Sequence, residues 1–231
     1  MIAPMPARAV LLDALGTLVA LEPPAPRLVE LLRERHALAV DPAAARRALR
    51  VEMSHYREHC GRAADAASLA ALRGECAAIL ARELGLAIAP EELLGTLLDS
   101  LRFSAFPEAP AALERWRAAG LALVVASNWD ISLHDVLAAT GLRERLDGVA
   151  TSAQVGASKP DARLFAAALE LAGAAPEEAV HVGDSLTEDV EGALRAGLRA
   201  VWLRRADDGG EPPAGVAVIR SLDELELELA A

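Results

Sequence analysis

Residues 9–18 read AVLLDALGTL, four apolar residues followed by Asp13 and, three positions later, by Gly16 and Thr17. A short apolar run of this kind predicts a buried strand over Ala9–Leu12, and Gly16 predicts a turn shortly after it. In an open parallel sheet, ligands bind beyond the carboxyl ends of the strands. The stretch therefore predicts a sheet strand that carries a functional carboxylate, Asp13, at its end.

The rest of the chain repeats the apolar runs and adds helical patterns between them. Further strands are predicted at 121–126, 149–151, 180–183, 200–203 and 216–219. Helices are predicted among them at 109–119, 132–139, 161–171 and 187–196. Strands that alternate with helices of this length imply βαβ units. We therefore expect an α/β fold, a doubly wound (Rossmann-like) parallel sheet with helices on both faces.

The segment 20–105 interrupts this alternation. It shows no convincing strand pattern, and proline clusters stand at both of its ends. Four helices are predicted in it, near 25–37, 42–60, 66–84 and 91–102. Asp41 is placed to cap the second helix and Gly85 to end the third. We expect an all-helical domain at 20–105, inserted into a core formed by residues 1–19 and 106–231.

Composition limits the classes of partner. The chain has 231 residues and a formal net charge of −11, which argues against a surface for nucleic acid or an anionic membrane. No apolar run approaches the roughly 18 residues of a membrane span. The two cysteines, Cys60 and Cys76, form no disulfide or metal pattern, as expected of reduced thiols. We expect a cytoplasmic protein, a monomer or a homodimer.

Polar side chains stand at or just beyond the ends of the predicted strands. Besides Asp13 these are Ser127, Asn128, Lys159, Asp184 and Asp189. Lys159 is the only lysine of the chain. An arginine would not replace it in a site that needs a compact ammonium, because the guanidinium group of arginine is planar. Folding of a doubly wound sheet brings these groups to one edge, so we expect a single cleft that holds several carboxylates and one ammonium.

Converging carboxylates raise one another's pKa values unless a cation neutralises them. Mg²⁺ suits such a site, because it commonly takes one or two carboxylates together with a phosphate oxygen and waters. Lys159 and the metal would then hold a phosphoryl group within reach of Asp13. Since a carboxylate nucleophile can form an acyl phosphate, the pattern predicts phosphoryl chemistry on a small molecule.

Four segments carry a resemblance to a known family. LLDALGTL at 11–18, VVASNWD at 124–130, SKPD at 158–161 and HVGDSLTED at 181–189 resemble, in order, the four motifs of the haloacid dehalogenase-like (HAD) hydrolase superfamily. The inserted helices lie where the C1-type helical cap of that superfamily does. The resemblance implies a catalytic core with a cap, and hydrolysis of a small phosphorylated metabolite with Mg²⁺ as cofactor.

The resemblance also implies a role for each matched residue. Asp13 would be the nucleophile, and Lys159 would bridge the nucleophile and the substrate oxygens. Ser127 would hydrogen-bond the phosphoryl oxygens, with Asn128 beside it.

The metal site is implied in the same way. Its ligands would be Asp13, Asp184 and the backbone carbonyl of Leu15. Asp189 would complete the shell of the metal or orient Lys159.

Leu15 departs from the pattern of the superfamily phosphatases. Their first motif resembles DxDGT, in which the second Asp protonates the leaving oxygen and then activates water. General acid–base help is worth about 10²–10⁴-fold, so we expect weak activity on alkyl phosphates. Glu22 or Glu188 could stand in for the missing acid. In the cap, Tyr56, Arg57 and Arg62 either select the substrate or form an ordinary surface.

Two alternatives stay open at this point. Haloacid dehalogenases of the superfamily also lack this Asp, because halide departs without a proton, although their fourth motif does not resemble GDSxxxD. The other alternative is a non-catalytic member that binds a phosphorylated metabolite. A phosphonatase is excluded, because its Schiff base needs a cap lysine and the chain has none besides Lys159.

Overall fold

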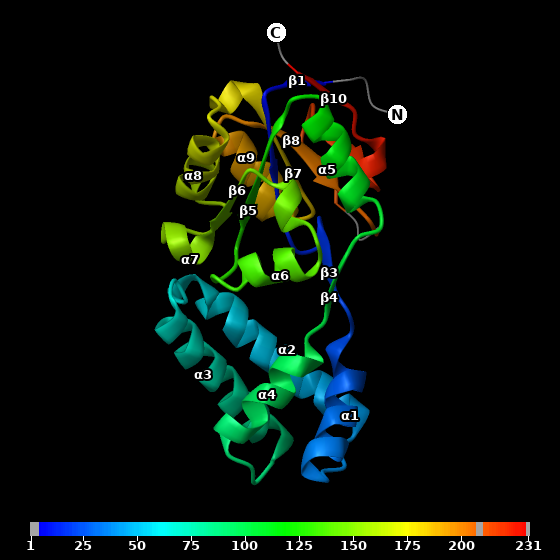
Figure 1. The fold of residues 1–231 in the computed structure, drawn as a ribbon, viewed down its shortest axis with the longest axis vertical. Coiled ribbons are helices and arrows are strands. Elements are labelled where there is room, and N and C mark those ends of the chain that lie inside the picture. The colour runs from blue at the N-terminus through cyan, green and yellow to red at the C-terminus, as the bar shows by residue number, and fades with distance from the viewer. Residues whose placement is uncertain (1–4, 207–209, 230–231) are drawn as a thin grey trace.

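The computed structural model describes residues 5–206 and 210–229; residues 1–4, 207–209 and 230–231 of the predicted core lie outside this range. A six-stranded, entirely parallel sheet has the order β6-β5-β2-β7-β8-β9 (Figure 1). Its strands are β2 Ala9–Leu12, β5 Ala122–Ser127, β6 Gly148–Thr151, β7 Ala179–Gly183, β8 Arg199–Leu203 and β9 Ala217–Ile219. The predicted doubly wound α/β fold is confirmed.

Helices cover both faces of this sheet. The helices are α5 Ala109–Ala118, α6 Leu133–Ala139, α7 Ser152–Val155, α8 Ala162–Ala172 and α9 Gly192–Arg195. Along β2, Val10 and Leu12 pack into the cluster that contains buried residues of α5 and α6, while Ala9 and Leu11 pack into the cluster of α8 and α9. Because successive side chains of a strand point to opposite faces, a strand covered on both sides must be apolar throughout.

The helix predicted at 187–196 has a different beginning. Residues Leu186–Glu191 form a π-helical turn, and α9 follows it. Ser185 is the reason for the wide turn, since its carbonyl accepts hydrogen bonds from the amides of both Asp189 and Val190. Such turns often occur at functional sites, and this one carries Asp189.

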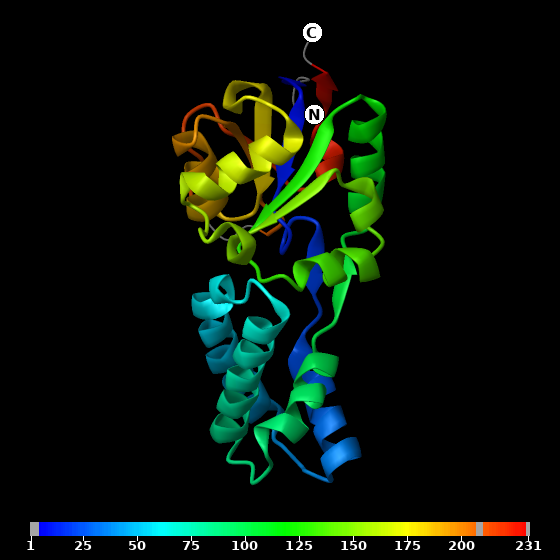
Figure 2. The same ribbon diagram turned by 60° about the vertical axis from the view of Figure 1, so that its left-hand side comes forward.

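Four helices form a separate bundle at the other end of the molecule (Figures 1 and 2). They are α1 Pro24–His36, α2 Pro42–His59, α3 Ala66–Leu84 and α4 Pro90–Ser100. As predicted, the Asp41 side chain accepts a 2.8 Å hydrogen bond from Ala44 N at the start of α2, and Gly85 ends α3 in the left-handed conformation. The bundle has its own apolar core, which contains the free thiols Cys60 and Cys76.

Two short strands join the bundle to the sheet, where the sequence predicted none. β3 Val19–Leu21 pairs antiparallel with β4 Phe103–Ala105, at the two ends of the helical segment. Each strand has three residues, too few for an alternating pattern to stand out. We propose that the domain boundaries fall in these two linkers. A further pair, β1 Met5–Ala7 and β10 Leu227–Leu229, runs parallel.

Within the described residues, no helix has both the length and the apolar character needed to cross a membrane.

Candidate active site

Asp13, Ser127 and Asp184 come from the carboxyl ends of three neighbouring strands. β2 lies between β5 and β7, and the strand order reverses there, which is where ligands bind in doubly wound sheets. Asp13 directly follows β2, Ser127 ends β5 and Asp184 follows β7. The Ser127 hydroxyl donates a 3.1 Å hydrogen bond to Asp13 Oδ1. The sheet therefore brings together residues that lie more than 100 positions apart in the chain.

Lys159 joins two carboxylates. Its Nζ donates hydrogen bonds of 2.6 Å to Asp13 Oδ1 and to Asp189 Oδ1, and the side chain is buried. Burial alone would lower the pKa of the Lys159 ammonium, but the two carboxylates outweigh it and raise that pKa above its ordinary value. Lys159 therefore stays charged beside Asp13.

Asp189 holds Lys159 in place. Its Oδ1 also accepts a 2.9 Å hydrogen bond from His181 Nε2, and its Oδ2 accepts one of 2.9 Å from Ser185 N. Burial would raise the pKa of Asp189, but Lys159 and His181 hold it below the usual range. Both carboxylate oxygens are thus already hydrogen-bonded. Of the two roles predicted for Asp189, this arrangement favours orienting Lys159. His181 itself is fully buried.

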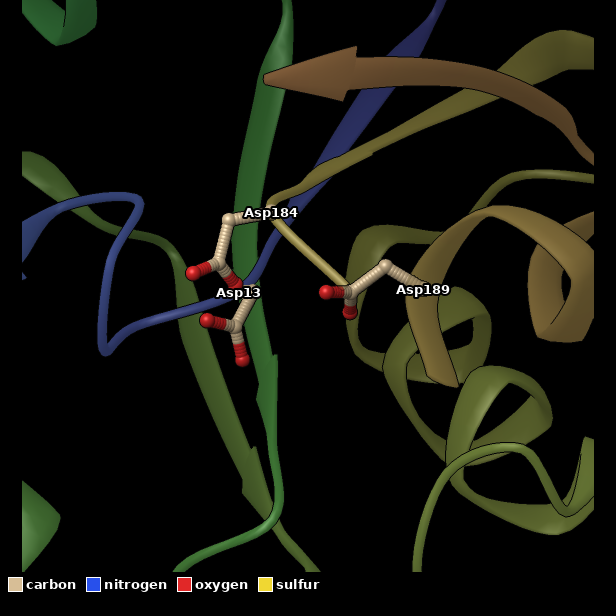
Figure 3. Close-up of side chains that lie close together, drawn as sticks. All are labelled: Asp13, Asp184 and Asp189. Carbon is tan, nitrogen blue, oxygen red and sulfur yellow. The ribbon is translucent and has the colours of Figure 1, made fainter. Parts of the chain in front are cut away.

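Asp13, Asp184 and Asp189 form an acidic cluster. Ligand oxygens of the three lie within 4.8 Å of one another, and Figure 3 shows the carboxylates turned toward each other. Partial burial, together with the charges of Asp13 and Asp189, raises the pKa of Asp184 to about 7. Asp13 and Asp184 both have raised pKa values, so their ionised forms lack a fully compensating charge. A cluster of this kind that offers only oxygen donors fits a hard divalent cation.

Two glycines allow this close approach. Gly16 has a φ of +87°, and a Cβ on it would lie 2.0 Å from Asp184 Oδ2. A Cβ on Gly183 would lie 2.2 Å from Asp189 Cγ. Any larger residue at either position would therefore displace a carboxylate of the cluster.

Asn128 contacts the backbone of Lys159 on both sides. Its Oδ1 accepts a 2.6 Å hydrogen bond from Lys159 N, and its Nδ2 donates one of 3.0 Å to Lys159 O. The same Nδ2 donates to Glu188 Oε2 at 3.1 Å. The amide predicted to lie beside the phosphoryl group thus fixes the loop that carries the lysine.

A cavity of about 720 Å³ lies between the sheet and the helical bundle. Asp13, Ser127 and Asp184 line it on the sheet side, while α2 and α3 line it on the other. The Tyr56 hydroxyl on α2 donates a 2.8 Å hydrogen bond to Asp130 Oδ2, which links the bundle to the loop after β5. The acidic cluster therefore lines a cavity that the bundle covers from the other side, as expected of a catalytic core with a cap.

The sequence model of the haloacid dehalogenase-like hydrolase family matches residues 7–197. The chain belongs to this family. A phosphoserine phosphatase of Thermus thermophilus is 44% identical over 114 residues, which are 49% of this chain and 46% of that protein. The chain spans about half the length of the curated relatives it matches.

Solved structures agree on the fold. A HAD phosphatase from Thermococcus onnurineus is 30% identical, with a TM-score of 0.64 over 94% of this chain and 95% of that one. A dehalogenase has a TM-score of 0.71 at 24% identity, over 97% of this chain and 96% of that one. At that identity the likeness shows the fold alone.

Leu15 lines the cavity together with Asp13 and Gly16. Of the two glutamates considered as replacement acids, Glu188 lines the cavity as well. Glu22 is exposed in the linker before α1 and is not among the lining residues.

Among the cap residues considered for substrate selection, Tyr56 and Arg57 line the cavity, whereas Arg62 pairs with Glu75 at 2.9 Å. Glu52 and Arg73 also line it and were not predicted from the sequence. A signal for Glu52 was available, because it lies on the same helical face as the apolar residues of α2.

Proposed function

We propose that this hydrolase is a Mg²⁺-dependent phosphatase that acts on a small phosphorylated metabolite through an aspartyl phosphate on Asp13. The observation that carries the proposal is the shared ammonium of Lys159, held at 2.6 Å from both Asp13 and Asp189 beside a three-carboxylate cluster. The phosphatase names of similar proteins support it. The proposal includes a cytoplasmic location and a monomer or homodimer.

The reaction has two steps at phosphorus. In the first, the Asp13 carboxylate forms a bond to phosphorus and the bond to the leaving oxygen breaks. In the second, water attacks phosphorus, the bond to Asp13 breaks, and inorganic phosphate leaves. Ser127 and Lys159 both donate to Asp13 Oδ1, which orients the carboxylate before the attack.

Charge stabilisation comes from Lys159 and from the metal. Lys159 supplies a fixed positive charge in a buried site, where electrostatic stabilisation is strong. Asp13, Asp184 and the Leu15 carbonyl would hold the Mg²⁺, with Asp189 orienting Lys159. When bound, Mg²⁺ supplies positive charge to the phosphoryl oxygens.

Leu15 favours leaving groups that need no proton. A carboxyl at this position would protonate the departing oxygen, and a leucine side chain cannot. Acyl and aryl phosphates are therefore favoured over alkyl phosphates. Leu15 is also what keeps a 2-haloacid dehalogenase as the second candidate, since halide leaves without protonation.

The test is release of phosphate, with Mg²⁺, from acyl, aryl and sugar phosphates by wild type and Asp13→Asn. We expect release that depends on Asp13 and falls steeply from acyl and aryl to alkyl phosphates. Absence of Asp13-dependent release from every compound would overturn the proposal. Halide release from 2-haloacids without added metal would then indicate the dehalogenase, and phosphate binding without turnover the non-catalytic member.

A further inference from the structure

Arg205, beyond the end of β8, contacts the loop of residues 14–18 that follows Asp13. Its Nε donates a 2.9 Å hydrogen bond to Gly16 O, and its Nη2 donates one of 2.8 Å to Thr17 O. A guanidinium presents its donors in a rigid planar fork, so bonds to two successive carbonyls fix the orientation of both peptide groups. Arg205 is not among the residues that line the cavity. It therefore acts on the loop and not on a bound substrate.

The same guanidinium is anchored to the chain that returns from the cap. Its Nη1 donates a 2.6 Å hydrogen bond to Glu108 Oε1, and its Cζ lies 3.5 Å from the centroid of the Phe106 ring. Both of these residues follow β4, and Phe106 N donates a 3.0 Å hydrogen bond to the carbonyl of Leu18 at the end of the loop. Only 22% of the Arg205 side chain and 12% of the Glu108 side chain are exposed, so water screens this ion pair less than a surface pair. Arg205 thus joins the loop to the linker β4.

The loop keeps one backbone carbonyl unused. At both of its ends the carbonyls accept hydrogen bonds from backbone amides, and the carbonyls of Gly16 and Thr17 accept those of Arg205. Among the residues that the structure describes, none donates a hydrogen bond to Leu15 O. This is the carbonyl that the proposed function assigns to Mg²⁺. Arg205 therefore occupies the two carbonyls next to the proposed ligand and leaves the ligand itself free.

Gly16 connects this arrangement to the acidic cluster. A Cβ on Gly16 would lie 2.0 Å from Asp184 Oδ2, so the Gly16 backbone packs directly against that carboxylate. Arg205 holds the same residue by its carbonyl. Close-packed groups transmit displacements to one another, so a shift of the Gly16 backbone would change the position of the Asp184 carboxylate in the cluster.

We propose that Arg205 is a positioning residue for the Mg²⁺ site, which holds the loop of residues 14–18 in the shape that leaves Leu15 O free for the metal and fastens that loop to the cap linker. This role rests on the proposed phosphatase function, which assigns the carbonyl to the metal. The charge of Arg205 alone would oppose the binding of a second cation nearby. Its effect through the geometry of the loop has the opposite sign, so the two effects can be separated.

Calorimetry with Mg²⁺ measures which effect dominates. Arg205→Gln should raise the dissociation constant of Mg²⁺ by at least about tenfold, as is typical when a residue that supports metal ligands is lost. Removal of the charge alone would lower that constant. Arg205→Lys keeps the charge but loses the planar fork, and it should therefore not restore the affinity of the wild type.

Arg145→Gln is the matched control. Arg145 is also half-buried, donates to Glu114 at 2.8 Å and to the carbonyl of Gly141, and is not among the residues that line the cavity. This variant should leave the dissociation constant of Mg²⁺ unchanged. Urea unfolding of both variants shows whether they lose a similar amount of stability, which would exclude a general loss of structure as the cause.

Hydrogen exchange measures the loop itself, in protein stripped of metal. The amides of Gly16, Leu18 and Val19 donate hydrogen bonds to carbonyls of residues 14 and 19, so they exchange only when the loop opens. Arg205→Gln should speed their exchange by at least about tenfold, because hydrogen bonds from a charged group are lost. Arg145→Gln should not change it.

Two results would overturn this role of Arg205. One is a dissociation constant of Mg²⁺ that is unchanged or lower in Arg205→Gln, and the other is loop exchange no faster in that variant than in Arg145→Gln. Neither measurement needs turnover, so both stand if phosphate release fails to depend on Asp13. Conversely, Asp13-dependent release with an unchanged affinity for Mg²⁺ in Arg205→Gln would leave the phosphatase intact and remove only the role of Arg205.

Discussion

At the scale of single residues, the proposed function makes Leu15 the position with the most direct influence on the choice of leaving group. We predict that Leu15→Asp raises kcat/KM for an alkyl phosphate by at least about tenfold, since a carboxyl there can protonate the leaving oxygen and general acid catalysis is worth about 10²–10⁴-fold. Its effect on an aryl phosphate should be smaller, because that leaving group needs less assistance. Steady-state phosphate release measures both.

Leu15→Asn is the control for this prediction. Asparagine has nearly the shape of aspartate, but its amide is not an acid and cannot protonate the leaving oxygen. Leu15→Asn should therefore leave alkyl phosphate turnover low. Equal turnover of alkyl and aryl phosphates by the wild type would show that another group, such as Glu188, already supplies the proton.

Glu52 gives a prediction about stability rather than turnover. Its pKa in the folded protein is raised above the ordinary 4.5 by burial, against opposing effects of Cys76 on α3 and His55 on its own helix. The folded state therefore binds this proton more tightly than the unfolded state, and stability falls as pH rises above 4.5. Glu52→Gln removes that loss. We expect it to stabilise the protein by about 1–3 kcal/mol near pH 8.

Urea unfolding near pH 5 and near pH 8 measures this effect, and the gain should shrink at the lower pH. Glu75→Gln is a suitable control, because that exposed carboxyl has a pKa lowered by His55 and Arg62 and should give no gain that grows with pH. A destabilised Glu52→Gln protein near pH 8 would show that the carboxylate has a structural partner.

At the scale of elements, contact between α2 and the loop after β5 joins cap and core. The Tyr56 hydroxyl donates to Asp130, which is 1% exposed and also accepts a hydrogen bond from Ser132 N. We predict that Tyr56→Phe lowers the melting temperature by several degrees and raises KM more than it lowers kcat, because the cap is held less firmly over the substrate. An increase in KM no larger than that of Arg62→Gln would contradict this role.

The helices and strands also show how much of the fold could be predicted from the sequence. The six sheet strands were predictable because apolar runs buried on both faces stand out against polar flanks. The polar residues at or beyond the strand ends pointed to Asp13, Lys159 and Asp184, which the structure brings together. β3 and β4 were missed because three residues give no periodicity. The π-helical turn was missed as well, since it depends on Ser185 accepting two hydrogen bonds, which local propensity does not encode.

At the scale of the whole molecule, the cavity combines residues that no local pattern connects. Its sheet side could be predicted, because parallel strands end at a common edge. Its cap side could not, because which faces of α2 and α3 meet the core depends on how the bundle sits on the linkers β3 and β4. The positions of Glu52 and Arg73 on the cavity wall follow only from that placement.

The central claim is a phosphoryl group carried by Asp13, and rapid mixing with an aryl phosphate tests it most directly. The missing second Asp should slow attack by water more than departure of an aryl leaving group, so the aspartyl phosphate should accumulate. We predict a burst of the aryl alcohol that approaches one per active site, with the acid-quenched phosphoryl group on the peptide that contains Asp13. Asp13→Asn should show neither. Steady hydrolysis without a burst, and with no phosphoryl group on that peptide, would contradict the account.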